Sequence, residues 1–283
     1  MRGLGRLRYW QSQWQKNQTR MRKALWQRVH NPDGRSRPVF LVGCGRSGTS
    51  MLVWQLDKLW QVELFNENHP AAFDQFRLRP LSVIDTLIEQ SHAPLVVFKP
   101  ILDTCQTRNL LNRYPDARVI FAFRHYDDVI NSSLKKFGIE NRINHVRRWM
   151  ADDFGEFAVA PPPEQTKAYI RSRWHADRTP EEGAAIYWLF YNRLYFDLQL
   201  DQNPRVRLVQ YEKLVTEPHR EFRRLAQFLE IPFTERLVEG VFASSVGRNP
   251  APQIDGQLRA DCEALYQQLS ERVVMETAVP QPA

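Results

Sequence analysis

The residues best suited to chemistry form one glycine-rich stretch, residues 43–50, which reads GCGRSGTS. Its glycines let the backbone turn tightly and approach a ligand closely. A short apolar run precedes the stretch, and an amphipathic pattern of helical spacing begins at its hydroxyl residues. A strand, a glycine turn and a helix N-terminus form an anion cradle, because free backbone N–H groups and the helix dipole point at the ligand. The stretch therefore predicts a phosphate-binding loop.

This loop departs from the Walker A pattern of ATP-binding proteins at one informative position. The pattern G-x-x-x-x-G-K-[ST] begins at Gly43 and reaches Gly48, but Thr49 stands where the lysine belongs. The basic residue lies inside the loop instead, at Arg46. The loop lacks the lysine that would bind the β- and γ-phosphates of ATP. Its composition favours a nucleotide whose terminal group is not a polyphosphate, bound by backbone amides, by hydroxyl groups and by Arg46.

A second group of residues could bind another phosphate. Arg124 ends an apolar run that reads as a buried strand, and Ser132 follows eight residues later on the next helical pattern. The guanidinium of an arginine offers forked, charge-assisted donors to a phosphate. Asp128 lies four residues before Ser132, so a simple pair between Arg124 and Asp128 is the other interpretation. Together with the glycine loop, the arginine and serine predict two phosphate sites on one sheet.

The elements that must position these residues alternate along the chain. Strand-like apolar runs cover residues 39–42, 61–65, 95–99, 118–124 and 206–211, and helical patterns separate most of them, at residues 78–90, 104–114 and 127–137. Such alternation predicts βαβ units and an α/β fold with a central parallel sheet flanked by helices, a three-layer P-loop type. Ligands of such sheets bind at the carboxyl ends of the strands.

One region interrupts this alternation. Residues 138–180 contain three consecutive prolines and mix arginines with tryptophans, so they predict an insertion that could carry an acceptor site or be a solvated surface. The following residues, 181–200, predict a long helix whose aromatic side chains belong to the core. We expect an N-terminal arm over residues 1–37, one domain over 38–275 and a tail over 276–283.

Charge and cysteine content exclude several classes of protein. The 283 residues carry a net charge of +7. Residues 1–37 contain ten Lys or Arg and one acid, so the rest of the chain is slightly acidic and predicts no nucleic-acid partner. Three dispersed cysteines, at 44, 105 and 262, match neither a disulfide framework nor a metal site. We therefore expect no metal, and a reducing compartment, the cytoplasm.

The arm itself has an amphipathic pattern. Apolar residues, tryptophans among them, recur at helical spacing between arginines and lysines over residues 4–25. A basic amphipathic helix of this kind suits an anionic membrane surface and would make the protein peripheral to a membrane. A helix docked on its own domain, or a partly disordered arm, explains the pattern equally well. The chain has neither an apolar run long enough to span a membrane nor the apolar core of a secretory signal.

The motifs together resemble those of the PAPS-dependent sulfotransferases, in particular the bacterial, carbohydrate and tyrosylprotein branches. Residues 42–50 resemble their 5′-phosphosulfate loop, and residues 119–133 their 3′-phosphate motif. Residues 210–215, with Pro218 and the Phe-Leu pair at 228–229, are similar to the YEDLV…P…FL segment of the family. The resemblance extends over residues 38–269. It implies transfer of a sulfonate group from PAPS to a hydroxyl or amine, with PAP as the product.

The resemblance also implies roles for individual residues. The 5′-phosphate and sulfonate would lie against the glycine loop, and the 3′-phosphate against Arg124 and Ser132. Tyr211 would lie near the adenine, and Arg248 would belong to a loop that closes over the nucleotide. The implied nucleotide-binding residues are Gly45, Arg46, Ser47, Gly48, Thr49, Ser50, Arg124, Ser132, Lys136, Tyr211 and Arg248.

The acceptor needs a base, and the resemblance leaves two candidates. The histidine of a Lys-Thr-His segment in the cytosolic branch is absent, because the corresponding strand end reads FKPI at residues 98–101. Branches acting on protein tyrosine or carbohydrate use a glutamate in the loop after the first helix, and Glu67 matches that position. His69 is the second candidate. Lys99 would stabilise charge on the leaving group together with Arg46.

Two other functions remain open at this point. A P-loop kinase for a small molecule would require ATP and magnesium, and a non-catalytic nucleotide-binding scaffold would require neither the base nor Lys99. The glutamate base and the insertion rich in arginine and tryptophan favour a sugar hydroxyl on a glycan or glycolipid as the acceptor. The amphipathic arm is compatible with a lipid-linked acceptor.

Overall fold

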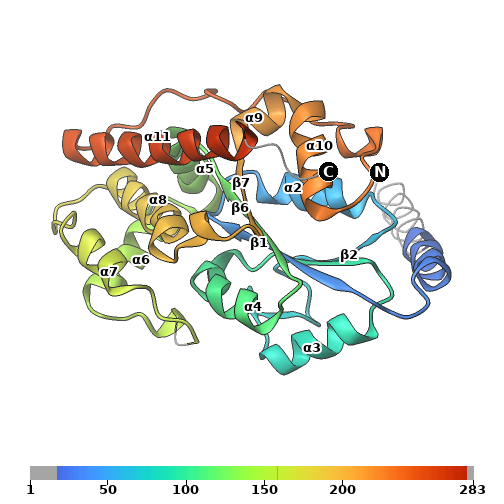
Figure 1. Cartoon of the computed structure of the whole chain (residues 1–283). Helices are drawn as coiled ribbons and strands as arrows, with labels where there is room; N and C mark the ends of the chain where they lie inside the picture. The colour runs from blue at the N-terminus through green and yellow to red at the C-terminus, as the bar shows by residue number, and fades with distance from the viewer. Residues whose placement is uncertain (1–17, 158, 279–283) are drawn as a thin grey trace, which may run out of the picture.

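The computed structural model describes residues 18–157 and 159–278. Its centre is a parallel sheet with the strand order β2–β5–β1–β6–β7 (Figure 1). The strands are β1 (Arg37–Gly43), β2 (Val62–Phe65), β5 (Leu95–Phe98), β6 (Arg118–Phe123) and β7 (Val206–Gln210). The sequence-based prediction of an α/β fold with a central parallel sheet is confirmed.

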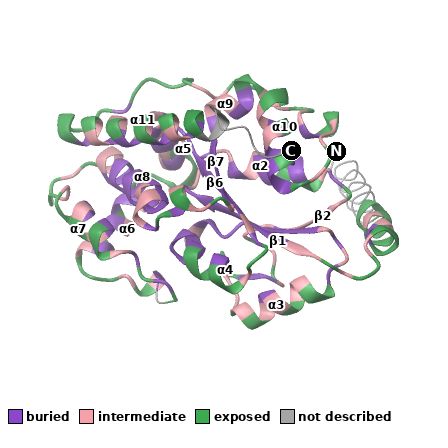
Figure 2. Ribbon diagram, in the orientation of Figure 1, coloured by how far each residue is buried: buried purple, intermediate pink, exposed green. Residues whose placement is uncertain are grey.

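The strands are almost continuously apolar because helices cover both faces of the sheet. In β1, Val39 and Leu41 pack on one face, whereas Phe40 and Val42 pack on the other. Figure 2 shows these strands as the buried interior of the molecule, with exposed residues on the outer helices. The apolar cluster on the face of Val39 and Leu41 includes residues of α2 (Thr49–Asp57) and α10 (Pro218–Leu229).

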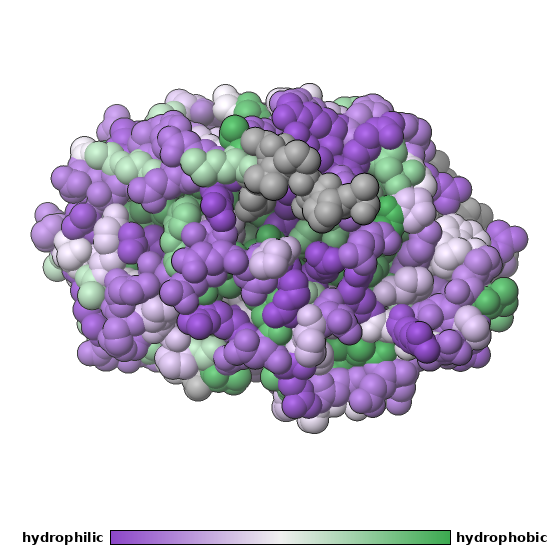
Figure 3. All heavy atoms as spheres, viewed as in Figure 1, coloured by the Kyte–Doolittle hydropathy of each residue, from purple (hydrophilic) through white to green (hydrophobic). Residues whose placement is uncertain are grey.

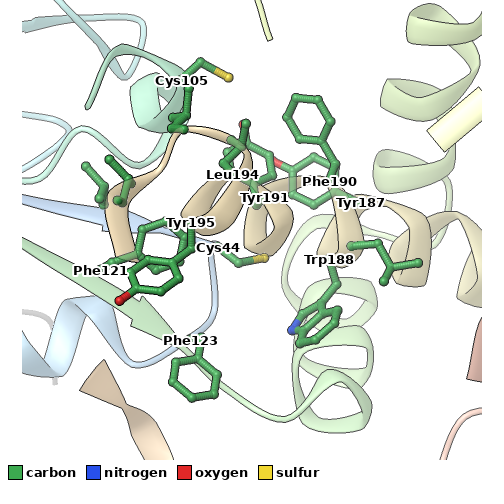
Figure 4. Packing of buried hydrophobic residues seen from close by; sticks show 14 of the residues in the cluster. Cys44, Cys105, Phe121, Phe123, Tyr187, Trp188, Phe190, Tyr191, Leu194 and Tyr195 are labelled. Carbon is green, nitrogen blue, oxygen red and sulfur yellow. The ribbon is translucent and has the colours of Figure 1, made fainter. Parts of the chain in front are cut away.

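The opposite face of the sheet has the larger core. Its central element is α8 (Pro180–Asp197), whose aromatic residues 187, 188, 190, 191 and 195 are buried (Figure 4). A capping box fixes the start of this helix, since Thr179 accepts from the N–H of Glu182, whose side chain accepts from the N–H of Thr179. The other helices of this side are α3 (Leu81–Gln90), α4 (Thr107–Arg113), α5 (Tyr126–Phe137), α6 (Glu140–Met150), α7 (Glu164–Arg171) and α11 (Gly256–Ala278).

Some elements differ from the sequence-based prediction. The insertion contains two helices, α6 and α7, and α6 packs against α8. Residues 73–78 form a small hairpin of β3 (Phe73–Asp74) and β4 (Arg77–Leu78), so the helix expected from residue 78 begins at Leu81. A 3-10 helix, η1 (Ile101–Gln106), precedes α4. The shorter helices are α9 (Tyr211–Thr216), η2 (Gly155–Phe157), η3 (Leu200–Gln202) and η4 (Glu235–Leu237).

Residues 18–30 of the N-terminal arm form a helix that docks on the domain beside the start of β2. Gln27 donates to the carbonyls of Trp60 and Val62 at 2.9 and 3.3 Å, and Lys23 pairs with Asp57 at 3.0 Å. Residues 1–17 of the arm and residues 279–283 of the tail lie outside the described part of the chain. Within the described part, no helix is both long and apolar enough to cross a membrane. The face in Figure 3 is mostly hydrophilic.

Candidate active site

Every strand of the central sheet leads into a residue that the sequence singled out. The glycine loop follows β1, and Tyr211 follows β7 directly. Lys99 follows β5, Arg124 follows β6, and Glu67 lies two residues beyond β2. Because the strands are parallel, their carboxyl ends meet at one edge of the sheet. The predicted residues therefore gather at that edge.

The glycine loop has the backbone conformation that its sequence requires. Gly43 and Gly48 have positive φ angles of 118° and 78°, and Arg46 has a φ of 71°. A Cβ on Gly48 would lie 2.1 Å from Cδ2 of Tyr211, so no other residue fits there without displacing that ring. α2 begins at Thr49 without a side-chain cap, which leaves its N–H groups free for an anion.

The hydroxyl groups of the loop differ in their partners. Ser47 is buried, and its Oγ has no hydrogen-bond partner among the described residues. Ser50 accepts a hydrogen bond from Nζ of Lys99 at 3.0 Å. Thr49 is buried at the start of α2. A buried hydroxyl without a partner is uncommon in folded proteins, so Ser47 Oγ indicates a place where a ligand atom belongs.

The second predicted phosphate site surrounds Arg124. This side chain is 7% exposed, pairs with Asp128 at 2.9 Å and lies over the ring of Tyr211 at 4.4 Å. Its Nε is buried without a partner in the described chain. The Nε1 of Trp188, on α8, fixes the strand end by donating to the Arg124 carbonyl at 2.9 Å. The pair with Asp128 is therefore present, and it leaves further donors of the guanidinium unused.

The two predicted phosphate sites are joined by a direct contact. Nε of Arg46 donates to Oγ of Ser132 at 2.9 Å, so a residue of the first motif meets a residue of the second. Burial lowers the pKa of Arg46, and the positive charges of Arg124 and Arg142 lower it further. Arginine stays protonated even so, and these crowded cations favour binding of an anion.

The candidate base Glu67 lies beside the same edge. Lys99, which is 1% exposed, donates from Nζ to Oε1 of Glu67 at 3.0 Å, while Glu67 itself is about a third exposed. Lys99 therefore bridges the glycine loop, through Ser50, and the carboxylate. Glu67 faces a cavity of about 290 Å³ that adjoins the glycine loop. This cavity is lined by Gly45, Arg46, Thr49, Ser50, Glu67, Phe76, Lys99, Ile101, Leu102, Phe137, Asn141, Arg142, His145 and Tyr187.

The other candidate base, His69, points elsewhere. Its Nδ1 accepts from the N–H of Ala71 at 3.3 Å, and its ring packs edge-on against Phe65 with 5.0 Å between centroids. His69 is absent from the lining of the cavity. Burial lowers the pKa of His69, and the charge of Arg20 lowers it further. The geometry therefore favours Glu67 over His69 as the residue that meets an acceptor.

A loop at residues 244–248 covers Arg124 from outside. The carbonyl of Ser245 accepts from Arg124, and its Oγ lies 2.6 Å from the Tyr211 hydroxyl. The N–H of Gly247 donates to Asp128 at 3.1 Å. Arg248 and Lys136, two of the predicted nucleotide contacts, are both exposed. The loop thus covers Arg124 and Asp128 through its backbone, and it contacts Tyr211 through Ser245.

The structure adds cavity residues that the sequence did not place at the site one by one, although three of them belong to the insertion that could carry an acceptor site. Phe76 comes from the β3–β4 hairpin, Asn141, Arg142 and His145 come from α6, and Tyr187 comes from α8. No local signal in the sequence identifies them, because they converge only after the insertion folds onto α8. The described residues contain no group of three His, Cys, Asp or Glu side chains that could hold a metal. The three cysteines are free and buried.

Comparisons with known proteins identify one family. Residues 36–247 match the model of the Sulfotransferase domain family. No curated protein matches the chain. Among solved structures, a sulfotransferase from Alicyclobacillus acidocaldarius is 16% identical and has a TM-score of 0.48, with 87% of this chain and 97% of that chain covered. Mouse sulfotransferase SULT7A1 complexed with PAP is 10% identical, with a TM-score of 0.45 and coverage of 86% and 89%.

These two similarities are too low to carry a functional argument. The family match rests on the sequence and spans most of the chain, from just before β1 to the loop that covers Arg124. It includes the glycine loop, Glu67, Lys99, Arg124 and Tyr211. The chain belongs to the sulfotransferase domain family, and it is a sulfotransferase.

Proposed function

We propose that this sulfotransferase uses PAPS as its donor and transfers the sulfonate to a hydroxyl of a glycan or glycolipid, with Glu67 as the base. The observation that carries the proposal is the joined pair of anion sites beside a carboxylate-lined cavity. Arg46 contacts Ser132 at 2.9 Å, and Lys99 contacts Glu67 at 3.0 Å. Sulfotransferases as a family use PAPS, whose 3′-phosphate distinguishes it from ATP.

The residues present fit such a donor. The buried Oγ of Ser47 and the buried Nε of Arg124 each lack a partner in the described chain, and they belong to the two separate phosphate motifs. The glycine loop, with its free N–H groups, would hold the 5′-phosphate and the sulfonate. Arg124 and Ser132 would hold the 3′-phosphate, and Tyr211, stacked on Arg124, would lie near the base of the nucleotide.

Bound PAPS would supply an activated sulfonate for direct transfer. The residues of the chain have two roles around it. Glu67 removes the proton from the acceptor hydroxyl at the cavity. Lys99 and Arg46 stabilise negative charge on the leaving phosphate, and both are already held in place, by Ser50 and by Ser132. Burial of Lys99 strengthens this stabilisation, because charges interact more strongly away from water.

The cavity supports a glycan or glycolipid as the acceptor. Its volume of about 290 Å³ is near the lower end of ligand pockets, so it admits one ring-sized group and leaves the rest of the acceptor outside. Phe76 and Phe137 line it and are half-exposed, at 53% and 43%. An exposed aromatic rim suits the apolar portion of a lipid-linked acceptor.

The N-terminal helix supports peripheral binding to an anionic membrane. Its inner side docks on β2, while Met21, Leu25 and Val29 are 68%, 63% and 74% exposed at a spacing of four residues. Replacing these three with serine in the full chain should abolish cosedimentation with vesicles containing an anionic lipid. Sedimentation equal to that of the unchanged protein would contradict this part of the proposal.

The donor is tested most directly by thermal stabilisation. PAP should raise the midpoint of thermal unfolding, whereas ADP or ATP with magnesium should raise it less, because Arg124 and Ser132 have no phosphate to bind in them. Transfer of label from PAPS into glycan and lipid extracts then tests the acceptor. Stabilisation by ATP with magnesium and none by PAP would favour the kinase instead. Stabilisation by PAP without transfer to any extract would favour a nucleotide-binding scaffold.

A further inference from the structure

One cation that lines the cavity has neither an ion pair nor a hydrogen bond to its side chain within the described chain. Arg142, on α6, is 6% exposed, and its Nε is buried without a hydrogen-bond partner. It takes part in none of the ion pairs of the described residues. Its guanidinium lies between two aromatic rings, 4.0 Å from the centroid of Tyr187 and 4.4 Å from that of Phe137. The arginine is therefore held by its flat faces, which leaves the N–H groups around its edge available.

The edge of this guanidinium lies toward the reacting end of the cavity. A Cβ placed on Gly45 would lie 3.4 Å from one terminal nitrogen of Arg142, so the arginine approaches the backbone of the glycine loop. The charge of Arg142 also lowers the pKa of Arg46, after burial and Arg124. The cavity is thus lined by Arg46, Lys99 and Arg142 but by a single carboxylate, Glu67, which Lys99 already binds.

A buried charge without a counter-ion is costly, and stacking on aromatic rings recovers only part of that cost. An anion that enters the cavity would complete the site. We propose that Arg142 binds a negatively charged group of the acceptor, so that the acceptor is an anionic molecule with a carboxylate, phosphate or sulfate close to the hydroxyl that is modified. This inference rests on the proposed sulfotransferase reaction and specifies its acceptor.

The arrangement assigns Arg142 to the acceptor more readily than to the donor. The donor's phosphates have their own residues in the glycine loop and around Arg124. Arg142 comes instead from the insertion, one residue after Asn141 and three before His145, and all three line the cavity. The Oδ1 of Asn141 is also buried without a partner in the described chain, and it could accept from an acceptor hydroxyl. A forked guanidinium matches the geometry of a carboxylate or phosphate.

The test compares matched acceptor probes that differ in charge alone. Calorimetry on PAP-loaded full-length protein would use p-nitrophenyl β-D-glucuronide against the corresponding glucoside, and 4-hydroxyphenylacetate against 4-(2-hydroxyethyl)phenol. Wild type should bind the anionic member of at least one pair about tenfold or more tightly, the range of a charge-assisted hydrogen bond. Arg142→Met, which keeps the stem between the two rings, should remove that preference. Arg147→Met, on the exposed side of α6, should keep it.

Three results separate the possibilities. Equal binding within both pairs by wild type, or no detectable binding of either anionic probe, would contradict an anionic acceptor. Arg142→Met that lowers PAPS turnover equally for both members of a pair would place Arg142 on the donor and overturn the assignment. A failure of PAP itself to bind would contradict the proposed function instead. Arg142→Met should also raise the thermal midpoint of the free protein or leave it unchanged, whereas a structural arginine would lower it when replaced.

Discussion

The charged side chains at the two ends of the central sheet differ in their partners. At the amino ends of the strands, Arg37 and Arg118 both pair with Glu230, which follows α10. Arg205 donates to three backbone carbonyls, of residues 111, 114 and 115, at 2.7 to 3.0 Å. Each of these arginines has a partner from the chain itself, although Nε of Arg37 is buried without one. A groove of about 890 Å³ lies at this end, and Arg37, Arg118 and Glu230 are among the residues that line it.

At the carboxyl ends of the strands, positively charged side chains outnumber carboxylates. Arg46, Lys99, Arg124 and Arg142 lie there with few carboxylates, and two of these arginines have a buried Nε without a partner in the described chain. The groove at the amino ends is about three times larger than the cavity, yet its charges neutralise one another. Size does not mark the active site in this protein. The candidate site is distinguished instead by buried cations that outnumber the carboxylates around them, an arrangement that favours an anionic ligand.

The largest expected effect is on turnover, and it comes from Glu67, at the carboxyl ends of the strands. Glu67→Gln should lower turnover by about 10²- to 10⁴-fold, the range of general base catalysis, because the amide cannot take the acceptor proton. The affinity for PAP should remain within about twofold. Steady-state kinetics and PAP calorimetry on the same variant check both parts.

The matched control is His69→Gln, which alters the other candidate base but lies outside the cavity. Its turnover should stay close to that of wild type. A large loss in the histidine variant, with near-normal activity in the glutamate variant, would reverse the assignment of the base.

The next largest expected effect is on the affinity for PAP, and it follows from removal of the Arg124 guanidinium. Arg124→Met should weaken PAP binding by about a hundredfold, since charge-assisted hydrogen bonds to a buried phosphate contribute roughly 1.5–3 kcal/mol. The single variant also leaves Asp128 buried without its cation. The double variant Arg124→Met with Asp128→Asn should recover stability but not PAP affinity. If the double variant bound PAP like wild type, the unmatched charge at this end would have no role in binding.

Much of this carboxyl end could be predicted from the sequence. Residues 95–99 and 118–124 are short and almost wholly apolar, so their strand character and their polar end residues, Lys99 and Arg124, follow from local pattern. The glycine loop is equally local. The contact between Arg46 and Ser132 could not be predicted, because it joins two motifs through the tertiary structure.

The cavity residues from the β3–β4 hairpin, α6 and α8 could not be predicted from local sequence patterns. The β3–β4 hairpin places Gln75 and Phe76 at positive φ angles of 46° and 66°, which residues other than Gly and Asn rarely adopt in a two-residue turn. Arg142 reads as one arginine among many in the insertion until α6 packs on α8. Tyr187 was predicted as core, and it is buried, but it also lines the cavity and stacks on Arg142.

In the insertion, Glu156 should make a smaller, pH-dependent contribution to the free energy of unfolding. This carboxylate accepts from Nε1 of Trp149 at 2.7 Å and pairs with Arg77 at 3.0 Å. Burial alone would raise the pKa of Glu156, but its interactions with the nearby His145, Trp149 and Arg77 side chains outweigh burial and lower the pKa to about 2. Glu156 thus supports the helix that carries Arg142.

Glu156→Gln should lower the free energy of unfolding at pH 7 by about 2 kcal/mol, since it removes the charge of a mostly buried pair. The folded pKa lies below the ordinary value of 4.5, so this stabilisation is complete above pH 4.5 and declines as the pH falls toward 2. Urea unfolding of wild type and variant at several pH values measures the difference. A difference that did not shrink between pH 5 and pH 3 would exclude the charge as its cause.

The smallest expected effect is on the free energy of unfolding and comes from Glu230, at the amino ends of the strands. Hydrogen bonding from Arg37 lowers the pKa of Glu230, and the charges of Arg37 and Arg118 contribute, but the glutamate side chain is 58% exposed. Glu230→Gln should therefore lower the free energy of unfolding by no more than about 1 kcal/mol, as for other exposed ion pairs. This contribution is present above the ordinary pKa of 4.5, is lost at lower pH, and should shrink in high salt. PAP affinity should not change, because Glu230 lies at the end of the sheet where cations already have partners; a changed affinity would mean that the two ends are coupled.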